Sequence, residues 1–329
     1  EVARFEAQGW WPGFLCCLLG LAICFVGRSA DINLIAQLGV IVAFQGATFG
    51  IVGFRVGLIL AFPLAYMFFL VPFAFMIVVS FWQRIEGAES GYAPGFEFTH
   101  YARFFSPLFT RHLLVSLEFA SLSAFLSVLV AFPFTYFLSR FGRRPQVLTL
   151  VFVLCVLSLS EVIVAYSWSV LLSRTAGISN LFVFLGIMEK PSSWMPGYGA
   201  VLFALTYFNL PFATLIMYPQ CTRLDKSLTE AALTLGASPV KTFFTVVVPL
   251  LWPTILTAFI VLFVFTMGAF ITPQWLGRPQ HWMYAILIND QANSRGNVPF
   301  ASALSIFLMV FTLALVAITV RLGRRSLQR

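Results

Sequence analysis

Charged residues are scarce in this chain of 329 residues, because Lys, Arg, Asp and Glu together make up only 10% of it. Hydrophobic residues make up 60%, phenylalanine alone occurs 38 times, and the mean hydropathy is +0.92. So little polar surface cannot cover a soluble globule of this size, which excludes a soluble domain. We therefore expect an all-α polytopic membrane protein.

Lysine occurs only three times, and its positions exclude a phosphate-binding loop. Each lysine follows Glu189, Asp225 or Val240, so the chain contains no Gly-Lys-Ser/Thr sequence with which it could bind and hydrolyse ATP. Gly-x-Ser-x-Gly and His-Glu-x-x-His are also absent, which disfavours a membrane enzyme. The five cysteines lie in or beside apolar runs without metal-type spacing, and neither a disulfide framework nor a metal site is expected.

Apolar runs of about 20 residues, the length that crosses a bilayer core, predict six core transmembrane helices. They lie near residues 57–82, 113–138, 147–171, 198–219, 251–272 and 299–320. Residues 1–55 precede these runs and predict a membrane extension. Two helices, near 10–26 and 34–54, are favoured, with one span plus an interfacial segment as the alternative. Gly46, Gly50, Gly53 and Gly57 recur at helical spacing and give the extension a smooth packing face.

Arginine and lysine lie close to the ends of the predicted spans and indicate the orientation. One set of loops contains Arg140, Arg143, Arg144, Arg223, Lys226, Lys241, Arg321, Arg324, Arg325 and Arg329. The positive-inside rule places these loops and the C-terminus in the cytoplasm. The formal charge of +8 is then an orientation signal with affinity for anionic membrane lipid, rather than a sign of nucleic-acid binding.

A polar insert at residues 222–250 interrupts the apolar runs. Ser227 stands three residues before Glu230 and predicts a capping box, so a short helix begins there and presents Ala231 and Ala232. Gly236 can end this helix in the left-handed conformation, and Ser238 before Pro239 predicts the start of a second helix. The insert therefore predicts a helix, a sharp turn and a helix, in which small residues permit close approach by a partner.

The complete pattern from Glu230 to Pro249, with Glu-Ala-Ala, Gly236 followed by Ala237, and the terminal proline, resembles the coupling loop of importer-type ABC permeases. The resemblance implies the type I ABC importer permease fold over residues 56–329, with the cytoplasmic coupling loop at 222–250. It also implies a location in the bacterial inner membrane. The implied partners are a cytoplasmic ABC ATPase dimer, which binds ATP and Mg²⁺, a second and related permease subunit, and a substrate-binding protein. Glu230, Ala231, Ala232, Gly236, Ala237 and Pro239 are the residues implied to contact the ATPase.

Further stretches are similar to the spermidine/putrescine branch of these permeases. They are Phe132 to Arg140, Gly268 to Gly277, which includes Phe270, and Asn297 to Leu304. The third core helix departs from the branch, because it contains Ala-Tyr-Ser-Trp where relatives often have Arg-aromatic-Ala-Trp. The resemblance thus implies a polyamine substrate, with an opine, an amino-acid-like compound, a phosphonate or ferric iron as alternatives.

Several residues inside or beside the predicted spans are candidates for the substrate pathway. Glu161 could select a cation, with Tyr166 and Trp168 offering aromatic faces. The alternative is a structural role, with Glu161 at a helix kink hydrogen-bonded to Ser158 or Ser160, or paired with a neighbouring arginine. For Glu118 we favour pairing with His112 or Arg111.

Two further candidates stand in the fourth core helix and in an outer loop. Asn209 precedes Pro211 in the middle of that helix, where a hinge or a pathway role competes with simple packing. Asp290 stands where a binding protein would dock. An exporter half or a membrane scaffold remains the alternative class, and would need no binding protein.

Overall fold

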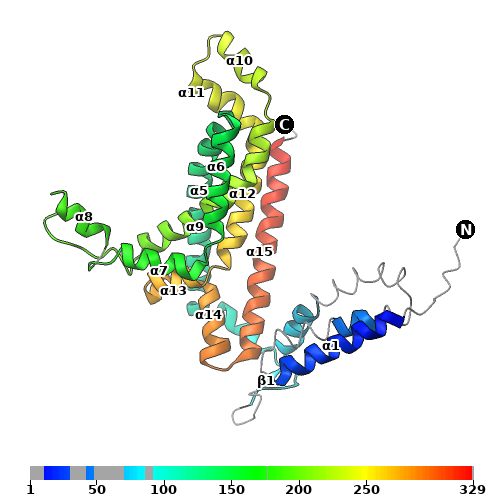
Figure 1. Ribbon diagram of the computed structural model, residues 1–329. Helices are drawn as coiled ribbons and strands as arrows, with labels where there is room; N and C mark the ends of the chain where they lie inside the picture. Colours follow the sequence, from blue (N-terminus) through cyan, green and yellow to red (C-terminus); the bar gives the residue numbers. More distant parts are fainter. Residues whose placement is uncertain (1–10, 30–41, 48–69, 86–91, 176, 328–329) are drawn as a thin grey trace, which may run out of the picture. The chain divides into compact units, whose positions relative to one another are not determined.

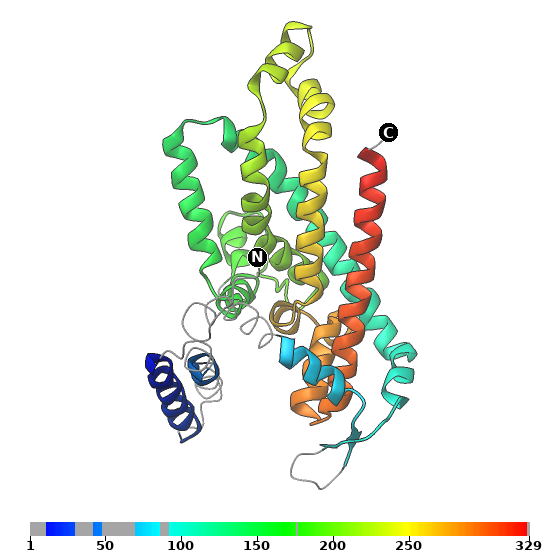
Figure 2. The ribbon, with the colours of Figure 1, turned by 90° about the vertical axis from the view of Figure 1, so that its right-hand side faces the viewer.

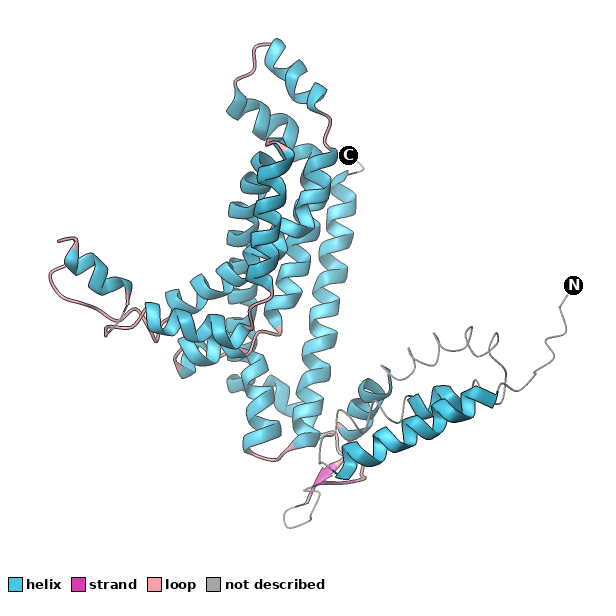
Figure 3. Ribbon diagram, in the orientation of Figure 1, coloured by secondary structure: helices cyan, strands magenta, loops and turns pink. Residues whose placement is uncertain are grey.

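The computed structural model describes residues 11–29, 42–47, 70–85, 92–175 and 177–327. The chain divides into two compact units, Glu1–Val79 and Ser80–Arg329. Figure 3 shows that nearly all of the described chain is helical. The all-α architecture expected from the composition is confirmed.

The first unit contains α1 (Trp11–Ser29), which matches the helix predicted near residues 10–26. A helical turn over residues 42–47 packs directly on α1. A Cβ added to Gly20 would lie 2.1 Å from the backbone nitrogen of Ala43, and one added to Gly46 would lie 2.3 Å from that of Cys17. The two backbones can touch only because both residues are glycine, which bears out the packing role predicted for Gly46. Gly50, Gly53 and Gly57 lie outside the described residues.

The second unit is built around four long apolar helical stretches. These are α5 (Pro107–Arg140), α9 (Tyr198–Arg223), the stretch Pro239–Met267 and α15 (Val298–Leu327). Figures 1 and 2 show them running side by side. Each is long enough to cross a membrane. Of the first predicted core span, only the helix Leu70–Val79 and the residues just after it are described.

The predicted third core span is not one straight helix. It is divided into α6 (Arg143–Leu157) and α7 (Glu161–Leu171), which meet at an angle of 92°. The predicted fifth span likewise stops early, at Met267, and the chain continues into the short α13 (Ile271–Leu276). α7 and α13 pack on each other and run across the direction of the long helices (Figure 1). Hydropathy alone does not reveal these breaks, because apolar residues dominate on both sides of each break.

Shorter elements complete the second unit. At one end of the bundle, α10 (Lys226–Thr234) and α11 (Pro239–Thr242) form a hairpin that leads through a π-helical turn, Phe243–Val247, into α12 (Val248–Met267). The remaining elements are β1 (Gln83–Arg84), β2 (Tyr92–Ala93), α4 (Thr99–Ala102), the 3₁₀ turns Arg103–Phe105 and Pro279–His281, α8 (Ile178–Phe184), α14 (Tyr284–Asn289) and the π turn Asp290–Ser294. The hairpin and the end of α15 lie at the same end of the bundle (Figures 1 and 2).

Small residues bring α5 and α9 together at the centre of the bundle. Ala120 and Ala124 on α5 and Ala213 on α9 are all fully buried. Ser127 donates a hydrogen bond to the carbonyl oxygen of Thr206 on α9 over 3.0 Å. Close packing of small side chains with interhelical hydrogen bonds is the usual means of association between membrane helices, so this pair forms the rigid core that positions the hairpin.

Candidate functional site

The hairpin formed by residues 225–242, called the coupling hairpin below, begins with a side-chain cap on α10. Asp225 is the cap, and its carboxylate accepts a hydrogen bond from the backbone N–H of Ser227 over 2.9 Å. The predicted capping box between Ser227 and Glu230 is therefore wrong, because the helix begins two residues earlier. The hydrogen bond from Ser227 holds the pKa of Asp225 below its usual value.

Gly236 ends α10 in the way that the sequence predicts. Its φ is +85°, and its N–H donates to the carbonyl oxygen of Leu233 while the N–H of Ala237 donates to that of Ala232. These two bonds define a Schellman motif. Ser238 then caps α11 by accepting a bond from the N–H of Lys241, with proline at the first helical position. The expected helix, turn and helix are confirmed.

The coupling hairpin exposes apolar side chains that no other described part of the chain covers. Leu235 is 88% exposed and Val240 is 67% exposed, and no residue of α10 is buried. Glu230 and Ala231 are also exposed, while Ala232 is partly covered. An apolar surface on so lightly packed an element is typical of a protein interaction site.

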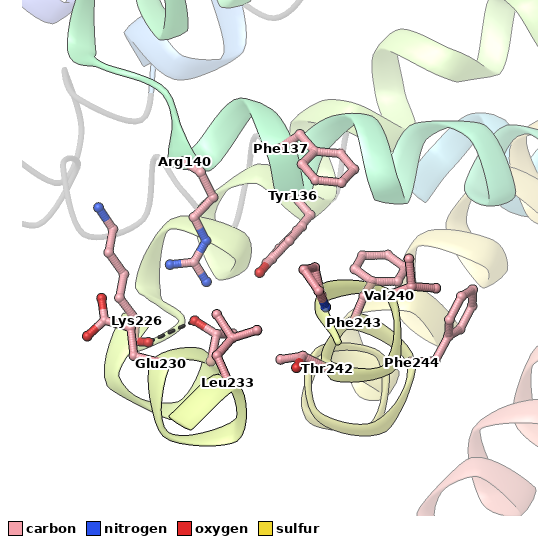
Figure 4. A pocket seen from close by; sticks show the side chains of 12 residues that line it. Tyr136, Phe137, Arg140, Lys226, Glu230, Leu233, Val240, Thr242, Phe243 and Phe244 are labelled. Atoms are coloured by element: carbon pink, nitrogen blue, oxygen red, sulfur yellow. Dashed lines mark hydrogen bonds between the residues drawn. The ribbon is translucent and has the colours of Figure 1, made fainter. Parts of the chain in front are cut away.

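A hollow of about 480 Å³ lies between the coupling hairpin and the end of α5. Figure 4 shows its lining. Arg140 and Tyr136 of α5 face Lys226 and Glu230 of α10 and the π-helical turn that leads into α12. The guanidinium of Arg140 stacks on the ring of Tyr136, 4.9 Å from its centroid. The sequence places Arg140 at a membrane boundary but gives no sign of this hollow.

Glu161 stands at the first position of α7, directly after the break in the third span. Its Oε1 accepts hydrogen bonds from the backbone N–H of Thr272 over 3.2 Å and from the hydroxyl of Thr272 over 2.9 Å. The carboxylate therefore ties α7 to the first turn of α13. It does sit at a kink, as one of the two hypotheses has it, but its partner is Thr272 rather than a neighbouring serine or arginine. The pathway role of Glu161 stays a prediction.

Tyr166 and Trp168 contact different parts of the second unit. Tyr166 lies edge-on to Trp275 of α13 with ring centroids 6.0 Å apart, and Trp168 packs against Phe203 of α9 at 4.8 Å. Glu161 and Tyr166 therefore both contact α13, whereas Trp168 packs against α9. The structure does not bring the two aromatic side chains together beside Glu161.

Asn209 forms a buried polar junction between three of the long helices. Its side chain is 1% exposed, and its amide donates to Thr266 Oγ1 of α12 over 2.9 Å and, more weakly, to Ser123 Oγ of α5 at 3.5 Å. α9 continues unbroken through Pro211. The geometry favours the packing role over a hinge at this position.

The remaining candidates lie apart from one another. Glu118 accepts a hydrogen bond of 2.7 Å from the hydroxyl of Tyr198, so the favoured pairing with His112 or Arg111 is wrong. His112 is instead bonded to the carbonyl oxygen of Trp282. Phe270 is partly exposed immediately before α13, and Asp290 forms an ion pair with Arg295, whose Nε is 2.9 Å from Oδ2.

The solved structures that share the fold include two of bacterial ABC transporters. A bacterial ABC transporter involved in the import of the acidic polysaccharide alginate matches with a TM-score of 0.61 and 19% identity, over 82% of this chain and 96% of its own. A bacterial alginate ABC transporter in complex with an alginate pentasaccharide-bound periplasmic protein matches with a TM-score of 0.62 and 20% identity, over 82% and 95%. The chain therefore has the fold of an ABC importer permease subunit, as its coupling-loop pattern predicts.

In sequence, the chain is similar to the spermidine/putrescine transport system permease protein PotB of Salmonella typhimurium. The two are 29% identical over 215 residues, which are 65% of this chain and 75% of the relative. The chain is a multi-pass membrane protein that resembles the spermidine/putrescine-type branch of these permeases.

A different family matches the N-terminal part. The model of the transmembrane exosortase family (Exosortase_EpsH) covers residues 1–89. The match includes the whole first compact unit, Glu1–Val79. The boundary after residue 55 stays a prediction.

Proposed function

We propose that this chain is the transmembrane permease subunit of an ATP-driven ABC importer, which forms the translocation path and couples it to a separate ATPase. The observation that carries the proposal is the coupling hairpin, where Gly236 presents Leu235 on a lightly packed projection at one end of the bundle. A cleft on the ATPase would receive Leu235 together with Glu230 and Ala231. ATP and Mg²⁺ would be bound by that partner and not by this chain.

The hairpin end of the bundle is proposed to face the cytoplasm, with the C-terminus on the same side. Arg140, Lys226 and Lys241 belong to this end, in agreement with the positive-inside rule. Closure of the ATPase pair would move the hairpin as a rigid body, because two caps and a Schellman motif fix its shape. The α5, α9 and α12 core, joined at Asn209, would transmit that movement to α7 and α13.

The substrate is proposed to be a polyamine or a similar small cationic or zwitterionic solute. The name of the PotB relative and the carboxylate of Glu161 within the crossing layer of α7 and α13 both favour a cation. A second permease subunit would complete the path. A substrate-binding protein, as in the alginate transporter complex, would deliver the substrate near Asp290. Residues 1–55 are proposed as a separate membrane extension.

The test is the effect of Leu235→Asp on copurification of the ATPase. A charge at this exposed apolar position should abolish assembly with the ATPase, because a buried unpaired carboxylate is strongly unfavourable. The fold of the chain should be unaffected, because Leu235 packs against little else. Phe184→Asp is a matched control, since Phe184 on α8 is 87% exposed and lies away from the hairpin. Equal ATPase recovery with both variants would contradict the proposal.

A further inference from the structure

Arg140 carries hydrogen-bonding capacity that the described part of the chain does not use. Its Nε and Nη2 atoms are buried and have no hydrogen-bond partner among the described residues. Burying guanidinium N–H groups without acceptors is costly. Figure 4 shows the guanidinium pointing into the hollow between Lys226 and Tyr136. The position therefore favours an anionic acceptor that the described part of the chain does not supply.

The charges around the hollow favour an anion. Lys226 and Glu230 are the other charged residues in its lining. Within the described ranges, neither Arg140 nor Lys226 forms an ion pair with Glu230 or with any other carboxylate. Two cations and one exposed carboxylate leave the hollow with a net positive charge, and the guanidinium is its most sheltered charge.

An apolar groove adjoins this hollow on the membrane side. The groove, of about 530 Å³, lies between α5 and α12 and shares Phe243 and Phe244 with the hollow. Its lining is almost wholly apolar and consists of Phe125, Val128, Leu129, Phe132, Pro133, Phe243, Phe244, Val248, Trp252, Ile255, Leu256 and Phe259. The cationic hollow and the apolar groove therefore lie next to each other, with two phenylalanines between them.

The dimensions match one leaflet of a bilayer. At 1.5 Å per residue, the groove from Phe125 to Pro133 runs about 12 Å along α5, and Arg140 lies about 10 Å beyond Pro133. Together these lengths are about 22 Å, which is close to one leaflet with its headgroup region, about half of the 40–45 Å of a whole bilayer. An acyl chain in the groove would therefore leave its phosphate near the level of Arg140.

We propose that the hollow and the groove together form a binding site for one anionic phospholipid, with an acyl chain between α5 and α12 and the phosphate at Arg140 and Lys226. Inorganic phosphate would fit the hollow but would leave the groove unexplained. Because the lipid would lie beneath the coupling hairpin, it would support the element that contacts the ATPase. The inference rests on the proposed function in one respect, namely that the hairpin end faces the cytoplasmic leaflet.

Native mass spectrometry of the detergent-purified full chain tests the site. The chain is incubated with equal amounts of phosphatidylglycerol and phosphatidylcholine, and retained lipids are counted. The wild type should retain phosphatidylglycerol preferentially, and Arg140→Gln should reduce that preference about fivefold, as expected for loss of one cation near a phosphate. Arg140→Lys, which keeps the charge, should preserve most of it. Arg321→Gln removes an exposed arginine at the same end and is the control.

The groove is tested separately by Leu129→Trp, which should lower the retention of both lipids by filling the space for the acyl chain. The inference is overturned if the wild type shows no preference, or if Arg140→Gln and Arg321→Gln behave alike. It is also overturned if Arg140→Gln keeps the lipid preference but loses ATPase copurification, because the hollow would then receive a carboxylate of the ATPase. Lipid preference without any ATPase copurification by the wild type would support the lipid site and refute the proposed function instead.

Discussion

Gly236 offers the sharpest test of how the coupling hairpin works. Its φ of +85° lies in the region that glycine adopts freely, and two Schellman hydrogen bonds depend on that conformation. An added Cβ would meet no atom within 4 Å. A Cβ at this position therefore strains the local backbone and does not collide with other elements of the chain.

The expected cost follows from this geometry. A residue with a Cβ costs roughly 1–2 kcal/mol in the left-handed region, with β-branched residues the least tolerant. Asparagine adopts this region several times more readily than most residues. We expect Gly236→Val to destabilise the hairpin by about 2 kcal/mol and Gly236→Asn by clearly less. Since α10 has no buried residue to resist the change, this strain should displace Leu235 from its position.

Two measurements follow the effect. Amide hydrogen exchange of α10 should accelerate in Gly236→Val and much less in Gly236→Asn. In the reconstituted complex with Gly236→Val, the amount of substrate taken up for each ATP hydrolysed by the ATPase should fall. With Gly236→Asn, this ratio should stay near that of the wild type. Wild-type uptake by Gly236→Val would refute the role assigned to this turn, and equal loss in both variants would refute the backbone explanation.

Three further predictions concern hydrogen bonds seen in the structure. Glu161→Ala should lower stability by about 1–3 kcal/mol, because it leaves the donors of Thr272 without an acceptor. Glu161→Gln should preserve stability while reducing polyamine uptake, so thermal unfolding and uptake assays separate the two effects. Equal unfolding of both variants would contradict the role of Glu161 in joining α7 to α13. Asn209→Ala should cost about 0.6–1.7 kcal/mol in a denaturant titration in detergent, and an unchanged midpoint would count against the three-helix junction. Because the pKa of Asp225 is lowered, its cap is complete above the ordinary value of 3.8 and is lost as the pH falls through the lowered pKa. Exchange of α10 amides should therefore show an acid-dependent loss of protection that is absent in Asp225→Asn, and the same pH dependence in both would refute the cap.

The coupling hairpin could be predicted because its signals are local. Glycine after a helix and Ser-Pro before the next one constrain the adjacent backbone directly. Only the first cap was misassigned, because Asp225 and Ser227 are both good capping residues two positions apart. The resemblance to the coupling loop of importer-type ABC permeases rests on the same short segment.

The crossing layer of α7 and α13 could not be predicted in the same way. Hydropathy measures composition, and the 92° break between Leu157 and Glu161 keeps an apolar composition on both sides. Ser160 followed by Glu161 is a helix-start signal, but such pairs also occur inside spans. The bond from Glu161 to Thr272 joins residues 111 positions apart, and no local pattern reports such a contact.

The most direct test of the central claim is ATP hydrolysis by the complete complex in lipid nanodiscs with its binding protein. Spermidine, putrescine, amino acids, opines, phosphonates and ferric iron would be added in turn to the wild-type complex and to the same components mixed with Leu235→Asp in place of the wild-type chain. The account predicts stimulation by polyamines in the wild type and none in Leu235→Asp. Hydrolysis that responds to no substrate, or that responds equally in Leu235→Asp, would contradict coupling through this hairpin.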